Sequence, residues 1–334
     1  MNYLSVCSGI EAASVAWHPH GWKPVAFAEI EKFPSAVLAH HYPDVPNLGD
    51  MTKYDSWKLG SIDLLVGGTP CQAFSVAGLK RGLADARGNL ALTFCEIADH
   101  YDPEWVVWEN VPGVLNDRSN AFGCFLGRLC GASDAIVPGG GRWASAGVVS
   151  GPARTVAWCI RDAQYFGVAQ QRRRVFVLAV RGPRNWRCAA ALFPVCDGVR
   201  RDPAEGRKAR KSVAGSLTKS LGRRCGVPDG PDTAGQLIPF GGMSGDVANC
   251  LTRREGKGPD SDATTTLVFD ATGPKIGVRR LTPRECERLQ GFPDDYTAIP
   301  KAADGSRYAA LGNSMAVPVM RWIAERIEFV KANF

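Results

Sequence analysis

A short apolar run followed by two glycines and a proline constrains the fold of this chain more than any other stretch. Ile62 to Val66 is such a run, of the kind that forms a buried parallel strand. Gly67-Gly68 then lets the backbone turn without a Cβ penalty, and Pro70 fixes its own φ and favours an extended Thr69. The sequence therefore predicts a stiff loop at the carboxyl end of a strand, where open α/β sheets bind their ligands.

The predicted loop carries a single cysteine, Cys71, flanked by Pro70 and Gln72. A thiol held there is a candidate nucleophile, provided that something lowers its pKa or traps its adduct. The alternative is a small buried hydrophobic side chain, which is how most free cysteines behave. A lone cysteine does not decide between the two interpretations.

The N-terminal residues predict the opening of a nucleotide-binding α/β unit. Tyr3 to Cys7 is a predicted strand, Ser8-Gly9 a turn, and Glu11 to Trp17 has the Ala-rich composition of a helix. Such a helix directs its N-terminus at the ligand. Val25 to Ala28 is a second predicted strand, and Glu29 at its carboxyl end can accept hydrogen bonds from both hydroxyl groups of a ribose.

A second acid follows a buried strand further along the chain. Helices are predicted for Lys32 to His41 and for Leu90 to His100. In the alternative interpretation, Glu29 is a plain surface acid that precedes the first of these helices. Trp105 to Trp108 is then a strand run, with Glu109 at its end. In a wall of Trp and Val, desolvation would raise the pKa of Glu109 and keep a proton available near neutrality. The alternative is that Glu109 caps the following turn.

Three arginines precede the apolar strand predicted for Phe176 to Val180. Alternation along an extended chain directs Arg172 and Arg174 to one face and Arg173 to the other, so that two guanidinium groups could hold a carbonyl oxygen and a phosphate. The alternative is an Arg-rich, solvated edge strand. Residues 116–154, by contrast, are rich in Gly and Ser, and we expect an insertion of loops there.

Positive charge is concentrated in one segment. From Arg172 to Arg224 there are fifteen Lys and Arg residues against three acids, a net of +12, whereas the whole chain carries +7 and the remainder therefore −5. One basic segment on a mildly acidic body is typical of polyanion binding, the alternative being a solvated basic linker. From Trp186 to Arg279 the chain is also rich in Gly and Pro, with a faint internal repeat that indicates two hairpin-like pieces.

Composition excludes several classes of protein. Apolar residues make up 45% and charged residues 22%, which is globular, and 334 residues suit about two domains. No apolar run approaches the roughly 18 residues needed to span a bilayer, and the N-terminal residues do not resemble a signal peptide. The 11 cysteines contain no Cys-x-x-Cys pair, which argues against a zinc ribbon or a disulfide framework and for reduced thiols in a cytosol.

The C-terminal part returns to regular α/β signals. Thr282-Pro283-Arg284-Glu285 is a capping box with Pro at the first helical position, and Gly291 closes that helix. Leu311-Gly312-Asn313-Ser314 then precedes a helix predicted for Met315 to Lys331, which we expect to close the sheet.

Taken in chain order, these stretches resemble the motifs of the DNA cytosine-C5 methyltransferases. The matching stretches are Gly49-Asp50-Met51, Pro70 to Ser75, Glu109-Asn110-Val111, Gln170 with Arg172 and Arg174, Arg280 to Pro293, and Leu311 to Ser314. The family's first motif is matched only in part, because Ser5, Cys7 and Glu11-Ala12 stand in place of an Asp, a Phe and paired glycines. The departure bears on cofactor affinity, and it makes Glu11 a candidate partner for the cofactor's ammonium group.

The resemblance implies an α/β fold with two domains. Residues 1–185 plus 280–334 would form a doubly wound, Rossmann-like sheet of the S-adenosylmethionine-dependent methyltransferases, and residues 186–279 a smaller, irregular, β-rich target-recognition domain. The implied catalytic residues are Cys71, Glu109, Arg172 and Arg174. The implied cofactor-binding residues are Cys7, Ser8, Gly9, Ile10, Glu29, Asp50, Pro70 and Asn313. The candidate DNA-binding residues are Gln72, Ser75, Arg87 and Gln170, to which the basic charge of the segment Arg172 to Arg224 adds Lys208, Arg210 and Lys211. No metal site is implied.

The resemblance also implies a reaction and a partner. In the family the Cys thiolate attacks C6 of a flipped-out cytosine, the Glu contacts N3 and the exocyclic amine, and C5 takes a methyl group from S-adenosylmethionine. We therefore expect a monomer that acts on double-stranded DNA in the cytoplasm of a bacterial or phage-infected cell, with no membrane contact and no need to bind a cognate restriction endonuclease.

Two alternatives stay open. A tRNA cytosine-5 methyltransferase shares the Cys loop, and a catalytically silent DNA-binding relative would fit the altered first motif. A thiol oxidoreductase is disfavoured, because no resolving cysteine lies near Cys71.

Overall fold

The computed structural model describes residues 1–70, 90–183, 191–193, 267–270 and 277–334. The chain divides into two compact units, and each is described by itself. The first comprises Met1–Asp162, Arg173–Pro194 and Met315–Phe334, and the second comprises Ala163–Arg172 and Val195–Ser314. The predicted target-recognition domain at 186–279 falls mostly outside the described residues, so the predicted domain boundaries stay a prediction.

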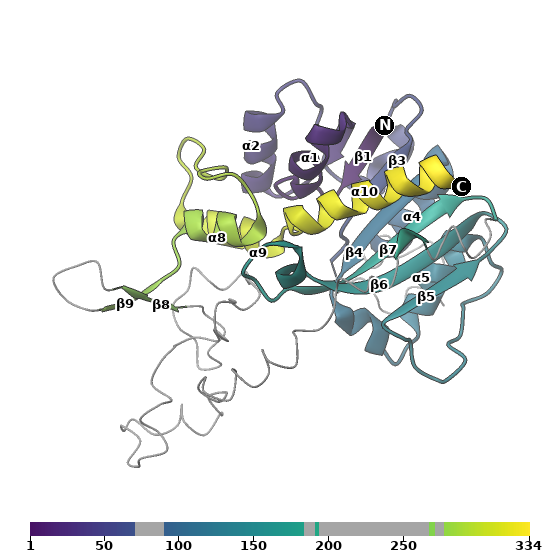
Figure 1. The fold of residues 1–334 in the computed structure, drawn as a ribbon. Helices are drawn as coiled ribbons and strands as arrows, with labels where there is room; N and C mark the ends of the chain where they lie inside the picture. The colour runs from purple at the N-terminus through teal and green to yellow at the C-terminus, as the bar shows by residue number, and fades with distance from the viewer. Residues whose placement is uncertain (71–89, 184–190, 194–266, 271–276) are drawn as a thin grey trace, which may run out of the picture. The chain divides into compact units, whose positions relative to one another are not determined.

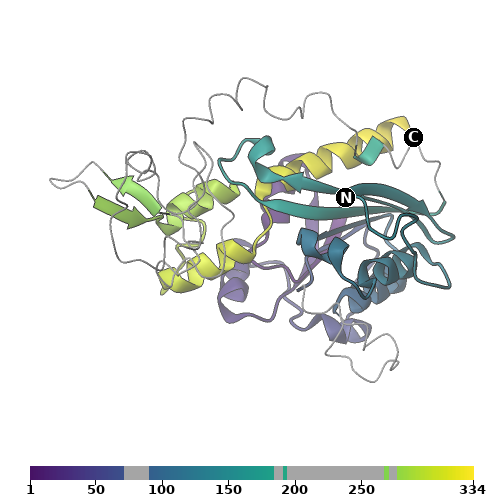
Figure 2. The same ribbon diagram turned by 90° about the horizontal axis from the view of Figure 1, so that it is seen from below.

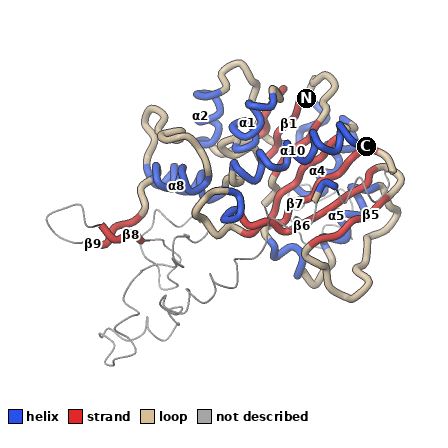
Figure 3. The backbone as a smooth tube through the Cα atoms, viewed as in Figure 1, coloured by secondary structure: helices blue, strands red, loops and turns tan. Residues whose placement is uncertain are grey.

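The first unit is built on a seven-stranded mixed sheet, drawn as red strands in Figure 3. The strands are β1 (Asn2–Val6), β2 (Lys23–Ala28), β3 (Leu64–Gly67), β4 (Trp105–Asn110), β5 (Ala146–Ser150), β6 (Arg154–Asp162) and β7 (Arg173–Arg181). Their order is β2-β1-β3-β4-β7-β6-β5. The four strands from β2 to β4 are parallel, and β7, β6 and β5 continue the sheet by antiparallel pairing (Figure 1). The expected Rossmann-like α/β fold is confirmed.

Helices cover both faces of this sheet. They are α1 (Ala12–Trp17), α2 (Lys32–His41), α4 (Leu90–Tyr101), α5 (Ala121–Cys130) and α10 (Val317–Asn333). Figure 2 shows α10 on one side of β6 and β7, with α5 on the other. On the α10 side, Trp17 Nε1 donates to Met320 O at 2.8 Å. On the other side Phe94, Phe125 and Trp108 lie in one buried core. None of the helices that the structure describes is long and apolar enough to cross a membrane.

Backbone pairing extends β4 further than the sequence predicts. The expected strand ended at Trp108, but β4 runs on to Asn110. Glu109 lies opposite Phe176 and Asn110 opposite Val175 in the antiparallel ladder with β7. A polar side chain does not end a strand whose backbone groups have partners, so Glu109 and Asn110 are the last two residues of β4 itself.

The expectation of loops throughout residues 116–154 is wrong, because the segment contains α5 and β5. Gly123 and Gly127 suppress the helical signal of α5, since glycine is a poor helix former. In the structure both face a neighbouring chain segment. A Cβ on Gly123 would lie 2.0 Å from Ile136 O, and one on Gly127 would lie 2.5 Å from Asp134 O. The glycines therefore permit close packing of the segment 134–136 against the helix.

The described residues of the second unit include two α-helices and a pair of antiparallel strands. The helices are α8 (Pro283–Gln290) and α9 (Asp304–Asn313), and β8 (Leu267–Asp270) pairs antiparallel with β9 (Gly277–Arg280). The predicted capping box is confirmed, because Glu285 N donates to Thr282 Oγ1 at 3.3 Å and Thr282 N donates to Glu285 Oε2 at 2.7 Å. The sequence did not predict α9.

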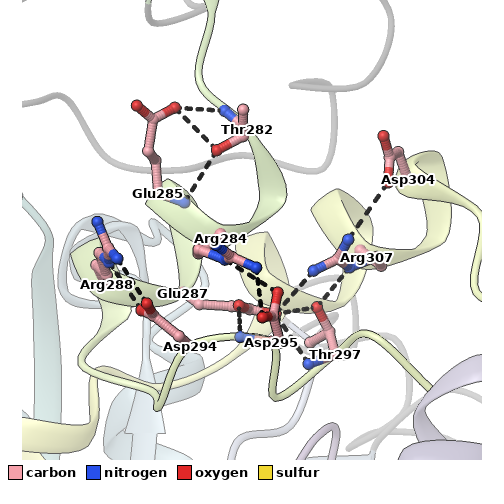
Figure 4. Close-up of polar contacts among 10 residues, drawn as sticks. All are labelled: Thr282, Arg284, Glu285, Glu287, Arg288, Asp294, Asp295, Thr297, Asp304 and Arg307. Atoms are coloured by element: carbon pink, nitrogen blue, oxygen red, sulfur yellow. Dashed lines mark hydrogen bonds and ion pairs between the residues drawn. The ribbon is translucent and has the colours of Figure 1, made fainter.

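A buried carboxylate holds α8, α9 and the loop between them together (Figure 4). Glu287 is fully buried, and it accepts from Asp295 N at 2.7 Å and Thr297 N at 2.8 Å. Arg307 of α9 donates to the same carboxylate at 3.2 Å. A buried charge is tolerated only when it is paired and hydrogen-bonded, so this set of partners fixes how α9 lies against α8.

Candidate active site

The turn after β1 leaves space beside its backbone. Cys7 and Gly9 have φ values of 48° and 56°, in the left-handed region. Ser8 fastens the turn to the sheet, because its Oγ donates to Ser5 O at 2.9 Å and accepts from Ala28 N at 3.2 Å. Among the described residues, no atom other than those of Gly9 and its two chain neighbours lies within 4 Å of the position that a Cβ of Gly9 would take. The turn therefore has room for a ligand to approach the main chain at Gly9.

Glu29 lies at the end of β2 and ties that end to the turn. Its Oε2 accepts from Gly9 N at 2.8 Å and its Oε1 from Glu31 N at 2.7 Å. The side-chain amide of Asn47 pairs with the main chain of Glu29, at 3.0 Å for each bond. Ile30, directly beside Glu29, is 74% exposed and was not among the predicted site residues. The sequence signal that could have drawn attention to Ile30 is its position directly after Glu29, the acid that follows a strand.

Cys7 lies close to two of the predicted cofactor residues. Its Sγ donates to Met51 Sδ at 3.4 Å. Burial, with the nearby carboxylates of Glu29 and Asp50, raises the pKa of the Cys7 thiol to about 12. Asp50 Oδ1 in turn accepts from Thr52 N at 2.9 Å. The structure thus brings Cys7, Glu29 and Asp50 together, and it keeps the thiol neutral at physiological pH.

Glu11 is a buried helix cap and does not offer its carboxylate at a surface, which contradicts the hypothesis that it attracts the cofactor's ammonium group. Its carboxylate is 1% exposed and accepts from Ser14 N at 2.9 Å and Ser14 Oγ at 2.6 Å, which makes it the N-cap of α1. Ser14 Oγ is also 2.6 Å from Tyr3 Oη. Burial raises the pKa of the Glu11 carboxyl, with the bonds from Ser14 acting in the opposite direction. A capping carboxylate points at the backbone N–H groups of the first helical turn. The sequence pattern alone did not reveal that Glu11 takes this role.

At the end of β3, Gly68 faces the carboxylate of Glu109. A Cβ on Gly68 would lie 3.3 Å from Glu109 Oε2 and 3.2 Å from Met315 Cε. Arg174 Nε is 3.1 Å from Glu109 Oε1, and both side chains are mostly buried, at 15% and 11% exposed. Within the described residues Glu109 Oε1 accepts no hydrogen bond, so the contact with Arg174 is an ion pair that leaves hydrogen-bonding capacity on this oxygen.

Side chains of β4 anchor Thr69, the residue before Pro70. Thr69 is 3% exposed, its Oγ1 accepts from Trp108 Nε1 at 3.0 Å, and its carbonyl accepts from Asn110 Nδ2 at 2.9 Å. Asn110 Oδ1 accepts from Val111 N at 2.8 Å, which fixes the amide. Pro70 follows and is exposed. The backbone therefore leaves β3 in a fixed direction, with Glu109 on the neighbouring strand.

Three further predicted site residues lie in the second unit. Arg172 is 3% exposed, and its guanidinium donates to the carbonyls of Gly312 and Ser314. Gln170 is fully buried, and among the described residues neither of its amide atoms has a hydrogen-bond partner. Asn313 is exposed at the last position of α9. The predicted alternation along the strand placed Arg173 on the opposite face from Arg172 and Arg174. Arg173 is exposed, as this requires, but β7 begins at Arg173 and so does not include Arg172.

The other predicted site residues lie outside the described residues. They are Cys71, Gln72, Ser75, Arg87, Lys208, Arg210 and Lys211. Within the part of the chain that the structure describes, no group of His, Cys, Asp or Glu side chains is arranged to hold a metal ion.

Comparison with known proteins gives one family. The family model for C-5 cytosine-specific DNA methylases matches residues 1–129 and 242–328. The chain is 38% identical over 464 aligned positions to the DNA N-6-adenine-methyltransferase of Escherichia phage P1, covering 97% of this chain and 61% of that relative, so it spans about three-fifths of the relative's length. It is 28% identical to the Type II methyltransferase M.HpaII of Haemophilus parainfluenzae, covering 98% of this chain and 88% of that protein.

Solved structures share the fold at low sequence identity. The S. pombe Dnmt2 methyltransferase superposes with a TM-score of 0.63 at 17% identity, over all of both chains. A putative DNA modification methyltransferase encoded within an E. coli prophage gives a TM-score of 0.58 at 16% identity, again over all of both chains. These two matches concern the architecture of the chain.

Proposed function

Because the chain belongs to the family of C-5 cytosine-specific DNA methylases, we propose that it transfers a methyl group from S-adenosylmethionine to C5 of a cytosine within a specific duplex DNA site. The observation that carries the proposal is the position of Glu109. Its carboxylate is paired with Arg174 and faces Gly68. Gly68 follows β3, the strand that leads into Pro70-Cys71. The reaction needs an acid and a cysteine nucleophile, and Cys71 follows the described residue Pro70 directly in the sequence.

The proposed chemistry begins with the base. C5 of cytosine is a poor nucleophile, so the ring must first become electron-rich. The Cys71 thiolate adds to C6 while Glu109 hydrogen-bonds and protonates N3, and C5 becomes the nucleophilic carbon of an enamine. After C5 has taken the methyl group, a base such as water removes the C5 proton, the C6–S bond breaks and the Cys71 thiolate is released. The cytosine must leave the base stack for this to happen.

The residues around the first turn fit a nucleoside cofactor. Glu29 and Asp50 supply hydrogen-bond acceptors, exposed Ile30 supplies an apolar surface, and Gly9 leaves space beside the main chain. S-adenosylmethionine would bring an electrophilic methyl group on a sulfonium. We propose that Glu29 receives the ribose hydroxyls, Asp50 the adenine amine, and Ile30 one face of the adenine ring.

The name of the phage P1 relative raises adenine as a second substrate. Its alignment runs over 464 positions, more than the 334 residues of this chain, so that relative has stretches that this chain lacks. An exocyclic adenine amine is itself the nucleophile and needs no covalent enzyme adduct, whereas Pro70-Cys71 and Glu109 together serve addition to a cytosine ring. Cytosine C5 is therefore the target that this chain's own residues favour.

Duplex DNA is the proposed partner because of the net charge of +12 between Arg172 and Arg224, which suits phosphate binding. Such a substrate would be met in the cytoplasm of a bacterial or phage-infected cell. The proposed domain division, with residues 186–279 recognising the target, places this basic segment largely within the recognition domain.

The test is a product analysis. Purified protein is incubated with S-adenosylmethionine and either duplex DNA or tRNA, and the digested nucleosides are identified by mass spectrometry. We expect 5-methylcytosine from DNA, none after Cys71→Ser, and a fall of roughly 100-fold in turnover after Glu109→Gln. N6-methyladenine or methylated tRNA as the main product would contradict the proposed substrate. Absence of any product, with no cofactor binding by calorimetry, would indicate a catalytically silent relative.

A further inference from the structure

A buried indole N–H ties the chain after β3 to the strand that carries Glu109. The parallel ladder between β3 and β4 ends at Gly67, which lies opposite Trp108. Two residues after Gly67, Thr69 Oγ1 accepts a hydrogen bond from Trp108 Nε1 at 3.0 Å. Thr69 is 3% exposed and Trp108 is fully buried. Beyond the last ladder pair, this side-chain bond therefore continues the connection between the two strands.

Trp108 is itself held by the core of the first unit. Its ring stacks on Phe125 of α5, with the ring centroids 4.3 Å apart and the planes at 29°. A side chain packed among buried neighbours has few other rotamers available to it, because the interior is close-packed. A buried indole N–H also needs an acceptor, and the hydroxyl of Thr69 supplies one. The bond therefore fixes Thr69 to a side chain that cannot easily move.

Thr69 lies, along the chain, between the neighbour of one proposed catalytic group and the other group itself. On its N-terminal side is Gly68, at which a Cβ would lie 3.3 Å from Glu109 Oε2 and 3.5 Å from Glu109 O. On its C-terminal side Pro70-Cys71 follows directly. Two residues of extended chain span at most about 7 Å, so the Cα of Cys71 is no further than this from the Cα of Thr69. A shift of Thr69 would therefore be felt at both groups.

We propose that Trp108 and Thr69 are positioning residues, and that the hydrogen bond between them sets the direction in which the chain enters Pro70-Cys71 and thereby the rate at which Cys71 adds to cytosine. The inference rests on the proposed function, since it uses the Cys71 adduct. The stretches that match the family begin at Pro70 and at Glu109, so neither Thr69 nor Trp108 belongs to them.

The first experiment separates the hydroxyl of Thr69 from its shape. Thr69→Val keeps the branched shape and removes the acceptor, whereas Thr69→Ser keeps the acceptor and removes a methyl group. The probe is long duplex DNA in which 5-fluorocytosine replaces cytosine throughout, so that the recognition sequence is present whatever it is. The fluorine at C5 cannot leave as a proton does, so after methyl transfer the C6–S bond stays intact and the adduct accumulates.

We expect the adduct to form about tenfold more slowly in Thr69→Val, because small misplacements of reacting groups reduce rates by up to roughly 100-fold. In Thr69→Ser the rate should stay within about twofold of wild type. A role in stability alone would not produce this difference, since both variants are measured as folded proteins. Saturating DNA and S-adenosylmethionine keep any change in affinity out of the measured rate, and thermal unfolding establishes that each variant is folded at the assay temperature.

A second set of variants tests the donor. Trp108→Phe keeps an aromatic ring in the core and removes the N–H, so it should slow the adduct as much as Thr69→Val does. The double variant should be no slower than either single variant, because each one already removes the bond. Trp105→Phe is the matched control on the same strand. Trp105 is 2% exposed, and among the described residues its Nε1 has no hydrogen-bond partner, so this variant should react at the wild-type rate.

Three results would overturn the proposal. One is a wild-type rate of adduct formation in folded Thr69→Val, which is the deciding test if Trp108→Phe does not fold. Another is a double variant in which the two single effects multiply. The third is a Trp105→Phe variant as slow as Trp108→Phe, because this would show a general loosening of β4. Failure of the proposed function looks different, since the wild type itself would then form no adduct and the inference would fall with it.

Discussion

The carboxylate of Glu109 on β4 lies beside Gly68, which follows β3, and a side chain at Gly68 would crowd it. The Cβ of an alanine there would lie 3.3 Å from Glu109 Oε2 and 3.2 Å from Met315 Cε. Both distances are shorter than ordinary van der Waals contact. Gly68, which follows β3, therefore also leaves the space that the Glu109 carboxylate occupies.

Gly68→Ala should consequently impair catalysis more than stability. The carboxylate must shift by a few tenths of an ångström, and small misplacements of reacting groups reduce turnover by up to roughly 100-fold. We expect at least about a tenfold lower turnover, with cofactor affinity unchanged. Gly60→Ala is the control, because no atom of the described residues, apart from Gly60 and its chain neighbours, lies within 4 Å of a Cβ at that position. Equal turnover in the two variants would mean that the position of Glu109 does not limit the reaction.

Glu11→Gln should alter stability in a pH-dependent way. Burial raises the pKa of the Glu11 carboxyl above its ordinary value of 4.5, so the folded protein binds this proton more tightly than the unfolded chain does. The stability contributed by this group is therefore fully present below pH 4.5 and is lost as the pH rises toward the folded-state pKa.

Glutamine does not ionise, so the unfolding free energy of the variant relative to wild type should increase as the pH is raised from about 4 to about 8. Urea denaturation at several pH values measures this difference, with Glu31→Gln at an exposed position as the control. A difference that decreases with rising pH would show that the bonds from Ser14 outweigh burial.

Gln170→Leu should separate stability from DNA methylation. Gln170 is fully buried and, among the described residues, both amide atoms lack a partner. An unpaired buried polar group costs about 1–3 kcal/mol, so leucine should leave the unfolding free energy unchanged or raise it by about 1 kcal/mol. If Gln170 binds DNA, as the sequence predicts, the KM for DNA should rise at the same time. Exposed Gln171→Leu is the neighbouring control, and a clear loss of stability at Gln170 would reveal a partner for its amide.

Replacing Lys208, Arg210 and Lys211 together by Ala should weaken binding to all DNA sequences about equally. Lys and Arg supply affinity by releasing counterions from phosphates, and the slope of log K against log salt should decrease by up to about 0.9 for each phosphate that is no longer neutralised. Binding titrations at several salt concentrations measure this slope. Replacing the exposed Lys23, Lys53 and Lys58 by Ala is the charge-matched control. A weakening confined to one DNA sequence would assign the three residues to base recognition instead.

Sequence signals for helix ends, caps and strands were reliable where they depend on interactions between residues that are neighbours in the chain. The helix Lys32–His41 has the predicted bounds, and the capping box at Thr282 forms as expected. The strands β1 to β4 lie within about two residues of their predicted positions. Propensity failed for α5, because Gly123 and Gly127 serve a close approach of the segment 134–136 that no local rule detects. It also failed for α9, whose carboxyl end is stabilised by Arg172 and Gln290.

The sequence by itself determined the family, the parallel strands and helices of the N-terminal half apart from α5, and the residue types available for chemistry, because turns, caps and apolar runs act over a few neighbouring residues. Only the tertiary structure decided which of these residues meet. Arg174 reaches Glu109 because β7 pairs antiparallel with β4, and Arg172 binds a carbonyl 140 residues away. Glu11 turned inward because a helix N-terminus needed its oxygen. Such choices follow from packing and from the cost of leaving buried polar groups unpaired, which depend on the whole fold.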